Sequence, residues 1–260
     1  MNFQRFVLLL SLTAFCFFRL QAQDTESDEG VTKKRISGKD IFTVQLTGNY
    51  DFPAADMAKR FGNNYRLGVG LLYKQANQFC WGVKGELLFG NVIREDSLMI
   101  NLKTSQNGVI AQVGDVLNPA TFERGYLIGI QAGRLFPLSR TNPNSGILST
   151  LGIGFMQHKI KLFDKDQSFP QLRDEYVKGY DRLSNGLYLE HFTGYMYFSK
   201  NKLINCMMGL NIVCAFTKGR RDFLYDVARS DTRSRTDLLV GLKLGWIIPM
   251  YKKVSEETYY

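Results

Sequence analysis

The sequence predicts an all-β protein, an eight-stranded antiparallel transmembrane β-barrel of the outer-membrane type with long outer loops. Three observations predict this fold class. Apolar and small or polar residues alternate in eight segments, and the connections between these segments are alternately long and short. An apparent export signal begins the chain, and nothing after it is long and apolar enough to form a spanning helix.

Segment 236–250 shows the alternation most clearly. Its even positions carry large apolar side chains from Leu238 to Ile248, whereas Gly241 and Lys243 are among its odd positions. A period of two requires an extended strand, because a helix would spread both sets around its axis. An apolar face opposite a face of Gly and Lys is typical of a transmembrane strand, with lipid outside and a polar lumen inside. A strand of a soluble sandwich fits this segment alone equally well, so recurrence of the pattern decides.

The same pattern recurs in seven further segments. They are 40–50, 65–74, 79–89, 125–136, 146–161, 184–199 and 203–217. The connections are long, short, long, short, long, short and long, which is the order of a meander with both ends in the periplasm and its long loops outside. The sheet has to close, because an open edge would leave backbone groups unpaired in hydrocarbon.

Two stretches predict structure in the outer loops. Residues 51–64 predict a short helix, with Pro53 in its first turn and Gly62 as its stop. Residues 109–113 are weakly apolar and predict a partial strand beyond the membrane. Beyond the export signal the chain has three cysteines with no metal-site spacing, so no disulfide framework is expected.

The N-terminus predicts export. A basic start, an apolar run over 6–18 and Ala22 before a polar stretch are typical of a secretory signal peptide spanning 1–23. Its removal takes two arginines and no acid, so the net charge falls from +9 to about +7. The predicted divisions after it are a flexible N-terminal lead at 24–39, the barrel at 40–250 and a C-terminal tail at 251–260. The predicted location is the outer membrane.

Inward-facing residues predict the content of the lumen. Eight strands leave room for side chains only, so we expect a filled core in which charges pair, such as Lys84 or Lys243 with Glu86. The predicted polar network consists of Arg66, Lys84, Glu86, Gln131, Asn205, Asn211 and Lys243, and His158 and Glu190 are also placed inward. A narrow path for a solute or a proton through the same residues is the alternative.

The sequence predicts no enzyme. Only two histidines are present, and Gly-x-Ser-x-Gly, metal-ligand spacing and a phosphate loop are all missing from the sequence. His191 and Glu190 are adjacent on one strand and point to opposite faces. His158 beside Ser149 or Asp164 is an unspecific candidate. We therefore expect no catalytic residue, cofactor or metal.

Basic stretches in the last outer loop predict contact with anions. Guanidinium groups suit phosphate, so the predicted residues for binding anionic lipid are Arg220, Arg221, Arg233 and Arg235. The predicted partners are outer-membrane lipid and lipopolysaccharide. A solvated charged loop is the alternative, and nucleic acid is a poor candidate because an exported barrel does not meet it.

Three stretches resemble the small outer-membrane β-barrel proteins of Bacteroidetes-type bacteria. They are 52–64, 178–183 and 245–252, together with the closing residues Tyr259 and Tyr260. The resemblance implies a Gram-negative cell-envelope location and a barrel fold, and little about activity. The expected function is a structural or interaction role in the envelope. An accessory component of a protein secretion or surface-assembly apparatus, with envelope or secretion proteins as partners, and a narrow channel are the alternatives.

Overall fold

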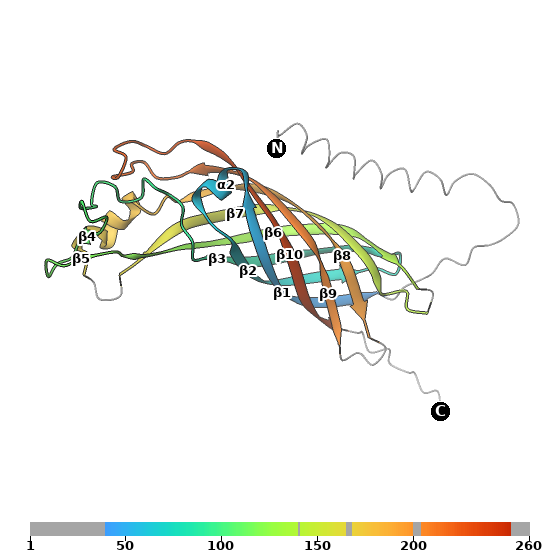
Figure 1. Cartoon of the computed structure of the whole chain (residues 1–260). Coiled ribbons are helices and arrows are strands. Elements are labelled where there is room, and N and C mark those ends of the chain that lie inside the picture. The colour runs from blue at the N-terminus through green and yellow to red at the C-terminus, as the bar shows by residue number, and fades with distance from the viewer. Residues whose placement is uncertain (1–39, 140, 165–167, 200–203, 251–260) are drawn as a thin grey trace, which may run out of the picture. The chain divides into compact units, whose positions relative to one another are not determined.

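A computed structural model describes residues 40–139, 141–164, 168–199 and 204–250. Eight antiparallel strands close a barrel in the order β1-β10-β9-β8-β7-β6-β3-β2 (Figure 1). Strands that follow one another along the chain are neighbours in the sheet, and β1 closes it by pairing with β10. The predicted fold class is therefore confirmed. The expected signal peptide, N-terminal lead and C-terminal tail at 1–23, 24–39 and 251–260 lie outside the described residues.

The barrel strands have unequal lengths. Their bounds are β1 Ile41–Ala54, β2 Asn64–Lys74, β3 Phe79–Gly90, β6 Ala120–Pro137, β7 Gly146–Phe163, β8 Ser184–Phe198, β9 Asn205–Gly219 and β10 Ser234–Met250. The long connections all lie at one end of the barrel, called here the long-loop end, and the short ones at the other. In an outer-membrane barrel the long loops face the cell exterior.

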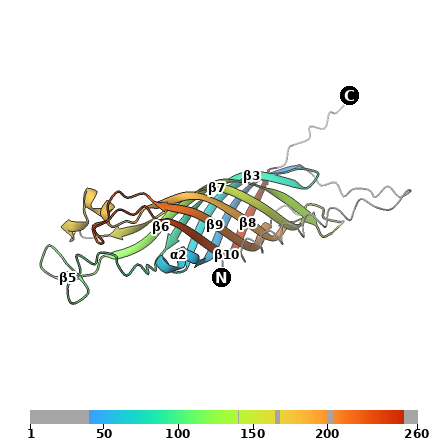
Figure 2. The same ribbon diagram turned by 90° about the horizontal axis from the view of Figure 1, so that it is seen from above.

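The long loops carry short elements of their own (Figure 2). These are helix α2 Ala55–Arg60, the hairpin of β4 Val109–Ile110 with β5 Val116–Leu117, and the 3-10 turns η1 Pro170–Leu172 and η2 Asp174–Gly179. The partial strand predicted at 109–113 corresponds to β4. No helix in the part of the chain that the structure describes is long and apolar enough to cross a membrane.

The predicted start of the loop helix was wrong. Pro53 lies in β1 opposite Leu239 of β10, and the helix begins only at Ala55. The pairing of β1 with β2 ends at Asp51, opposite Asn64. Beyond that point β1 is an edge on its β2 side, so a residue without an N–H is tolerated there.

The barrel has two distinct faces. Leu67, Val69 and Leu71 of β2 are exposed on the outside, whereas Arg66 on the opposite face is buried. Aromatic side chains stand near both ends of the outer apolar band. Tyr50 and Tyr65 lie near the long-loop end with ring centroids 5.0 Å apart, and Tyr73 and Trp81 lie near the other end at 5.9 Å. Such girdles are typical of a barrel spanning a bilayer.

The interior is layered along the barrel axis. On β3, Cys80 belongs to an apolar cluster near the short turns and Leu88 to another near the long loops. Lys84 and Glu86 lie between them in sequence and face inward. The charged layer is thus enclosed by apolar side chains on both sides.

Candidate functional site

Glu86 is the centre of a buried ion network inside the barrel. Its carboxylate accepts hydrogen bonds from Arg66 Nη1 at 2.6 Å, Lys243 Nζ at 2.9 Å and Lys84 Nζ at 3.3 Å. Arg66 also donates to both oxygens of Asp51, at 2.6 and 2.9 Å. Glu190 pairs with Lys84 and lies 3.7 Å from Lys243.

The network is electrically balanced. Three cations, Arg66, Lys84 and Lys243, face three carboxylates, Asp51, Glu86 and Glu190. Asn211 completes it, because with its amide turned to suit its neighbours it donates to Glu190 at 2.8 Å and accepts from Arg66 at 2.7 Å. Buried charges are tolerated when they are paired and hydrogen-bonded. The arrangement fills the lumen with side chains.

Two members of the predicted lumen network lie apart from it. Gln131 faces the lumen between Gly82 and Gly152, and its side chain makes no hydrogen bond within the described ranges. Asn205 is buried at the short-turn end, where it accepts the backbone N–H of Ser199.

Asp51 was missed because the sequence reading ended the first strand before it. Asp51 continues the series of inward, odd-numbered residues in β1, which are Thr43, Gln45, Thr47 and Asn49. This alternation could have predicted that Asp51 faces the lumen.

The structure gives His158 a different partner from those considered. Its Nε2 atom lies 3.1 Å from Asp237 Oδ2, which also accepts the Thr217 hydroxyl at 2.5 Å. Ser149 is instead bonded to His191, and Asp164 accepts two backbone N–H groups. Neither predicted neighbour of His158 contacts it. Within the described residues, no group of three His, Cys, Asp or Glu side chains is placed to hold a metal ion.

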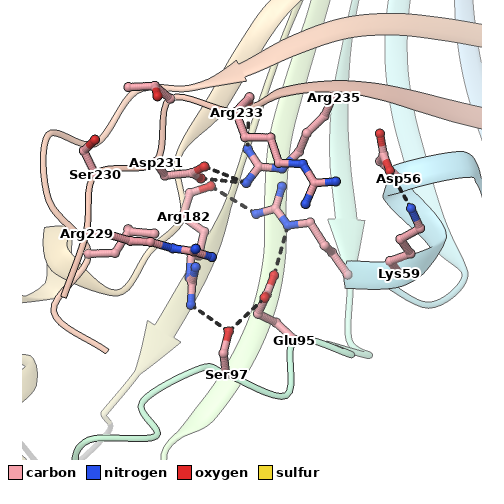
Figure 3. A pocket seen from close by; sticks show the side chains of 13 residues that line it. Asp56, Lys59, Glu95, Ser97, Arg182, Arg229, Ser230, Asp231, Arg233 and Arg235 are labelled. Carbon is pink, nitrogen blue, oxygen red and sulfur yellow. Dashed lines mark hydrogen bonds and ion pairs between the residues drawn. The ribbon is translucent and has the colours of Figure 1, made fainter. Parts of the chain in front are cut away.

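The rim pocket is a cavity of about 420 Å³ at the long-loop end (Figure 3). Helix α2, the loop after β3, the segment before β8 and the loop before β10 supply its walls. Six cationic side chains line it: Lys59, Arg60, Arg182, Arg229, Arg233 and Arg235. Three carboxylates line it: Asp56, Glu95 and Asp231. The difference is a formal charge of +3.

Most of these cations already have an anionic neighbour. Arg235 donates to both oxygens of Asp231 at 2.7 and 2.8 Å. Arg60 donates to Glu95 at 3.2 Å, and Arg182 donates to Asp226 at 2.7 Å.

Two pKa shifts follow from this packing. Burial lowers the pKa of the Arg60 guanidinium. The Lys59 ammonium, 2.8 Å from Asp56, lowers the pKa of that carboxyl through the hydrogen bond it donates.

Within the described part of the chain, Arg229 and Arg233 form no such bond, although the charge of Arg233 also contributes to lowering the pKa of Asp56. Among the residues that the structure describes, neither guanidinium makes an ion pair or a hydrogen bond with another side chain. Ser230 lies between them in the chain and also lines the pocket (Figure 3). Two unpaired guanidinium groups in a cavity of positive charge form a candidate anion site.

The four arginines predicted to bind anionic lipid divide into two pairs. Arg233 and Arg235 line the pocket. Arg220 instead donates to Asn185 at 2.6 Å, and Arg221 donates to both oxygens of Asp181 at 2.7 and 2.5 Å, a contact that raises the pKa of Arg221.

Four pocket cations were missed, namely Lys59, Arg60, Arg182 and Arg229. Only Arg229 belongs to the basic stretches of the last outer loop. Lys59 and Arg60 belong to helix α2 and Arg182 to the segment before β8, and only folding brings them to the pocket.

The side chains on the outer face indicate what surrounds the barrel. Large apolar side chains such as Leu67, Ile128, Leu187, Leu210 and Leu242 are exposed on strands around the closed sheet. Closure pairs the backbone groups that hydrocarbon would leave unsatisfied. This is an outer-membrane β-barrel.

Comparison with known proteins adds a likeness in fold. No family model and no curated protein matches the chain. Neisserial surface protein A is similar at 13% identity and a TM-score of 0.45, over 80% of this chain and 96% of that one. Ail of Yersinia pestis, in complex with the heparin analogue sucrose octasulfate, is similar at 11% identity and 0.40, over 81% and 99%. OprG from Pseudomonas aeruginosa is similar at 10% identity and 0.33, over 81% and 96%. Likenesses this distant carry no information on what this chain binds.

Proposed function

We propose that this barrel is an interaction protein of the outer membrane whose rim pocket binds phosphate groups of lipopolysaccharide. The observation that carries the proposal is the pair of unpaired guanidinium groups, Arg229 and Arg233, in a cavity whose lining has a formal charge of +3, one unit of which Asp226 offsets at Arg182. Each guanidinium presents a planar fork of donors that matches two phosphate oxygens. The pocket lies at the long-loop end, which in an outer-membrane barrel faces the leaflet that carries lipopolysaccharide.

The proposed role is binding and not catalysis. The side chains that line the pocket include no histidine and no cysteine, and most of its charged groups are cations. The ion network also argues against the narrow-channel alternative, because six charged side chains occupy the lumen at one level.

We also propose that residues 1–23 direct export and that the chain is one of the small barrels of Bacteroidetes-type bacteria. Support for the second point comes from residues 52–64, which resemble those barrels. They include helix α2, and this helix supplies Asp56 and Lys59 to the rim pocket.

Substitution of the two unpaired arginines tests the binding proposal. Arg229→Gln with Arg233→Gln is expected to weaken binding of purified lipid A to the refolded barrel by about tenfold or more, because charge-assisted hydrogen bonds are lost. Titration calorimetry at fixed salt reads the affinity. Lys159→Gln with Lys161→Gln is the matched control, since it removes the same charge from two exposed positions of β7 outside the pocket. Equal weakening by both pairs would indicate non-specific charge attraction, and unchanged binding in the first pair would remove the proposal.

A second candidate role is an accessory component of a secretion or surface-assembly apparatus. One observation favours it. Tyr176, Phe223 and Tyr225 form an exposed aromatic cluster in the outer loops, with ring centroids of Tyr225 at 5.9 Å from Phe223 and 6.5 Å from Tyr176. Exposed aromatics are typical anchors of protein interfaces. Under this role Tyr176→Ser with Phe223→Ser would lose a stoichiometric partner on co-purification, whereas the Arg229 and Arg233 variant would retain it.

A further inference from the structure

An apolar groove of about 480 Å³ crosses the outer face of β1, β2 and β3. Its walls are the aliphatic side chains of Leu46, Leu67, Val69 and Leu87, and Thr47, Gly48, Gly68 and Gly85 complete its lining. In the sheet register Gly48 lies opposite Leu67, and Gly85 lies opposite Val69. Gly48 and Gly85 both occupy outward positions, so the groove exists where two outward side chains are missing.

The fold does not require glycine at these two positions. A Cβ atom at Gly85 would meet nothing within 4 Å, and one at Gly48 would lie 3.8 Å from a methyl carbon of Leu67, an ordinary contact. Inward glycines behave differently, since a Cβ at Gly82 would lie 2.0 Å from the carbonyl oxygen of Leu71. Packing within the barrel therefore explains Gly82 and leaves the two outward glycines unexplained.

The groove lies in the part of the barrel that faces hydrocarbon. On β2 it falls between the girdle residues Tyr65 and Tyr73, and on β3 it falls between the girdle residue Trp81 and Phe89 near the long-loop end. Its backbone groups take part in the sheet, and its walls are aliphatic. An ordered water needs two or more polar contacts, and among the lining residues Thr47 alone has a polar side chain.

We propose that the groove binds one acyl chain of a membrane lipid. A flexible aliphatic chain is the molecule that surrounds the barrel at this depth, and it can lie in an open groove with aliphatic walls. A second copy of the protein fits less well. The groove has no aromatic or arginine anchor, which stable protein interfaces favour at their centre.

Filling the groove tests the proposal. Gly85→Leu directs a side chain into the groove from a position where an added Cβ atom meets nothing within 4 Å. Ala132→Leu is the matched control, because Ala132 is an exposed outward residue of β6 that does not line the groove. The probe is a diacylglycerol, which has acyl chains but no phosphate or other charged group and so does not report on the cationic rim pocket. Native mass spectrometry of the refolded barrel in detergent, with this lipid added, measures the fraction of barrel that retains one lipid.

The wild type and Ala132→Leu are expected to retain one lipid, whereas Gly85→Leu retains about tenfold less, because the chain loses its contacts with the groove. Heat-modifiable migration on a gel shows that each variant has folded. Equal retention by all three proteins would overturn the proposal. A wild-type dimer that becomes a monomer in Gly85→Leu would also overturn it, because a second copy would then be the occupant. Either failure leaves the lipid A measurement unaffected.

Discussion

Arg66 shows at the residue scale how this barrel accommodates charge in its interior. The side chain is fully buried, and its guanidinium donates to Asp51 and Glu86. A buried ion pair adds little net stability compared with apolar packing, but the loss of one partner leaves a charge uncompensated. The effect of a substitution in this network therefore depends on the charge that remains.

Arg66→Met is expected to lower the free energy of unfolding by roughly 3–5 kcal/mol, because Asp51 loses its cation inside the barrel. Urea unfolding in lipid vesicles, followed by tryptophan fluorescence, measures this change. Lys218→Met at an exposed position of β9 is the control and should change it by less than about 0.5 kcal/mol. Similar values for the two variants would show that the network does not bear on stability.

The alternation of inward and outward positions along each strand predicted which residues face inward, but not which of them contact one another. Lys84 and Lys243 were expected to pair with Glu86, and the structure places all three in one network. Asp237, by contrast, was not considered, although it bonds His158. Partners come from different strands, and their distances depend on the barrel register, which a single sequence does not specify.

At the scale of elements, facing glycines on β6 and β7 allow a large side chain to enter the lumen. Gly129 lies opposite Gly154, and a Cβ atom at Gly129 would lie 2.4 Å from the hydroxyl oxygen of Tyr188. At Gly154 it would lie 2.2 Å from the carbonyl oxygen of Ile128. Tyr188 of β8 lies opposite Gly154 in the sheet register and is fully buried. The two strands therefore depend on small residues where they face the interior.

Gly154→Val should destabilise the barrel by about 1–3 kcal/mol, the usual cost of overfilling a packed interior. Gly85→Val makes the same substitution on the outer face, where a Cβ meets open space, and should stay within about 0.5 kcal/mol. Urea titrations of both variants in one lipid composition give the comparison. A larger loss for Gly85→Val than for Gly154→Val would contradict the assignment of faces.

Strand ends were harder to predict than strand centres. The first strand was expected to end at Tyr50, but β1 continues to Ala54 through Pro53. Proline normally argues against a strand, and here it is accepted because β2 no longer pairs at that position. Likewise β6 begins at Ala120, before the predicted start at Gly125, because β7 extends far enough to pair with it.

For the whole molecule, the period of two and the alternating loop lengths were sufficient to predict an eight-stranded closed barrel. The rim pocket was not predictable in the same way. Arg60, Arg182 and Arg233 come from three different loops, and their meeting depends on how those loops fold over the barrel end. Periodicity describes strands and contains no information about loop packing.

The central claim is that the outer face of this barrel meets lipid. Trp81 and Trp246 both point outward, at 50% and 59% exposure, and Trp81 pairs with Tyr73 in one girdle. Tryptophan fluorescence in vesicles of brominated phospholipid tests the claim most directly. Strong quenching by lipid brominated near the glycerol, and weaker quenching by lipid brominated at the chain end, is the predicted result. Unquenched fluorescence from a protein that stays monomeric in water without detergent would contradict it.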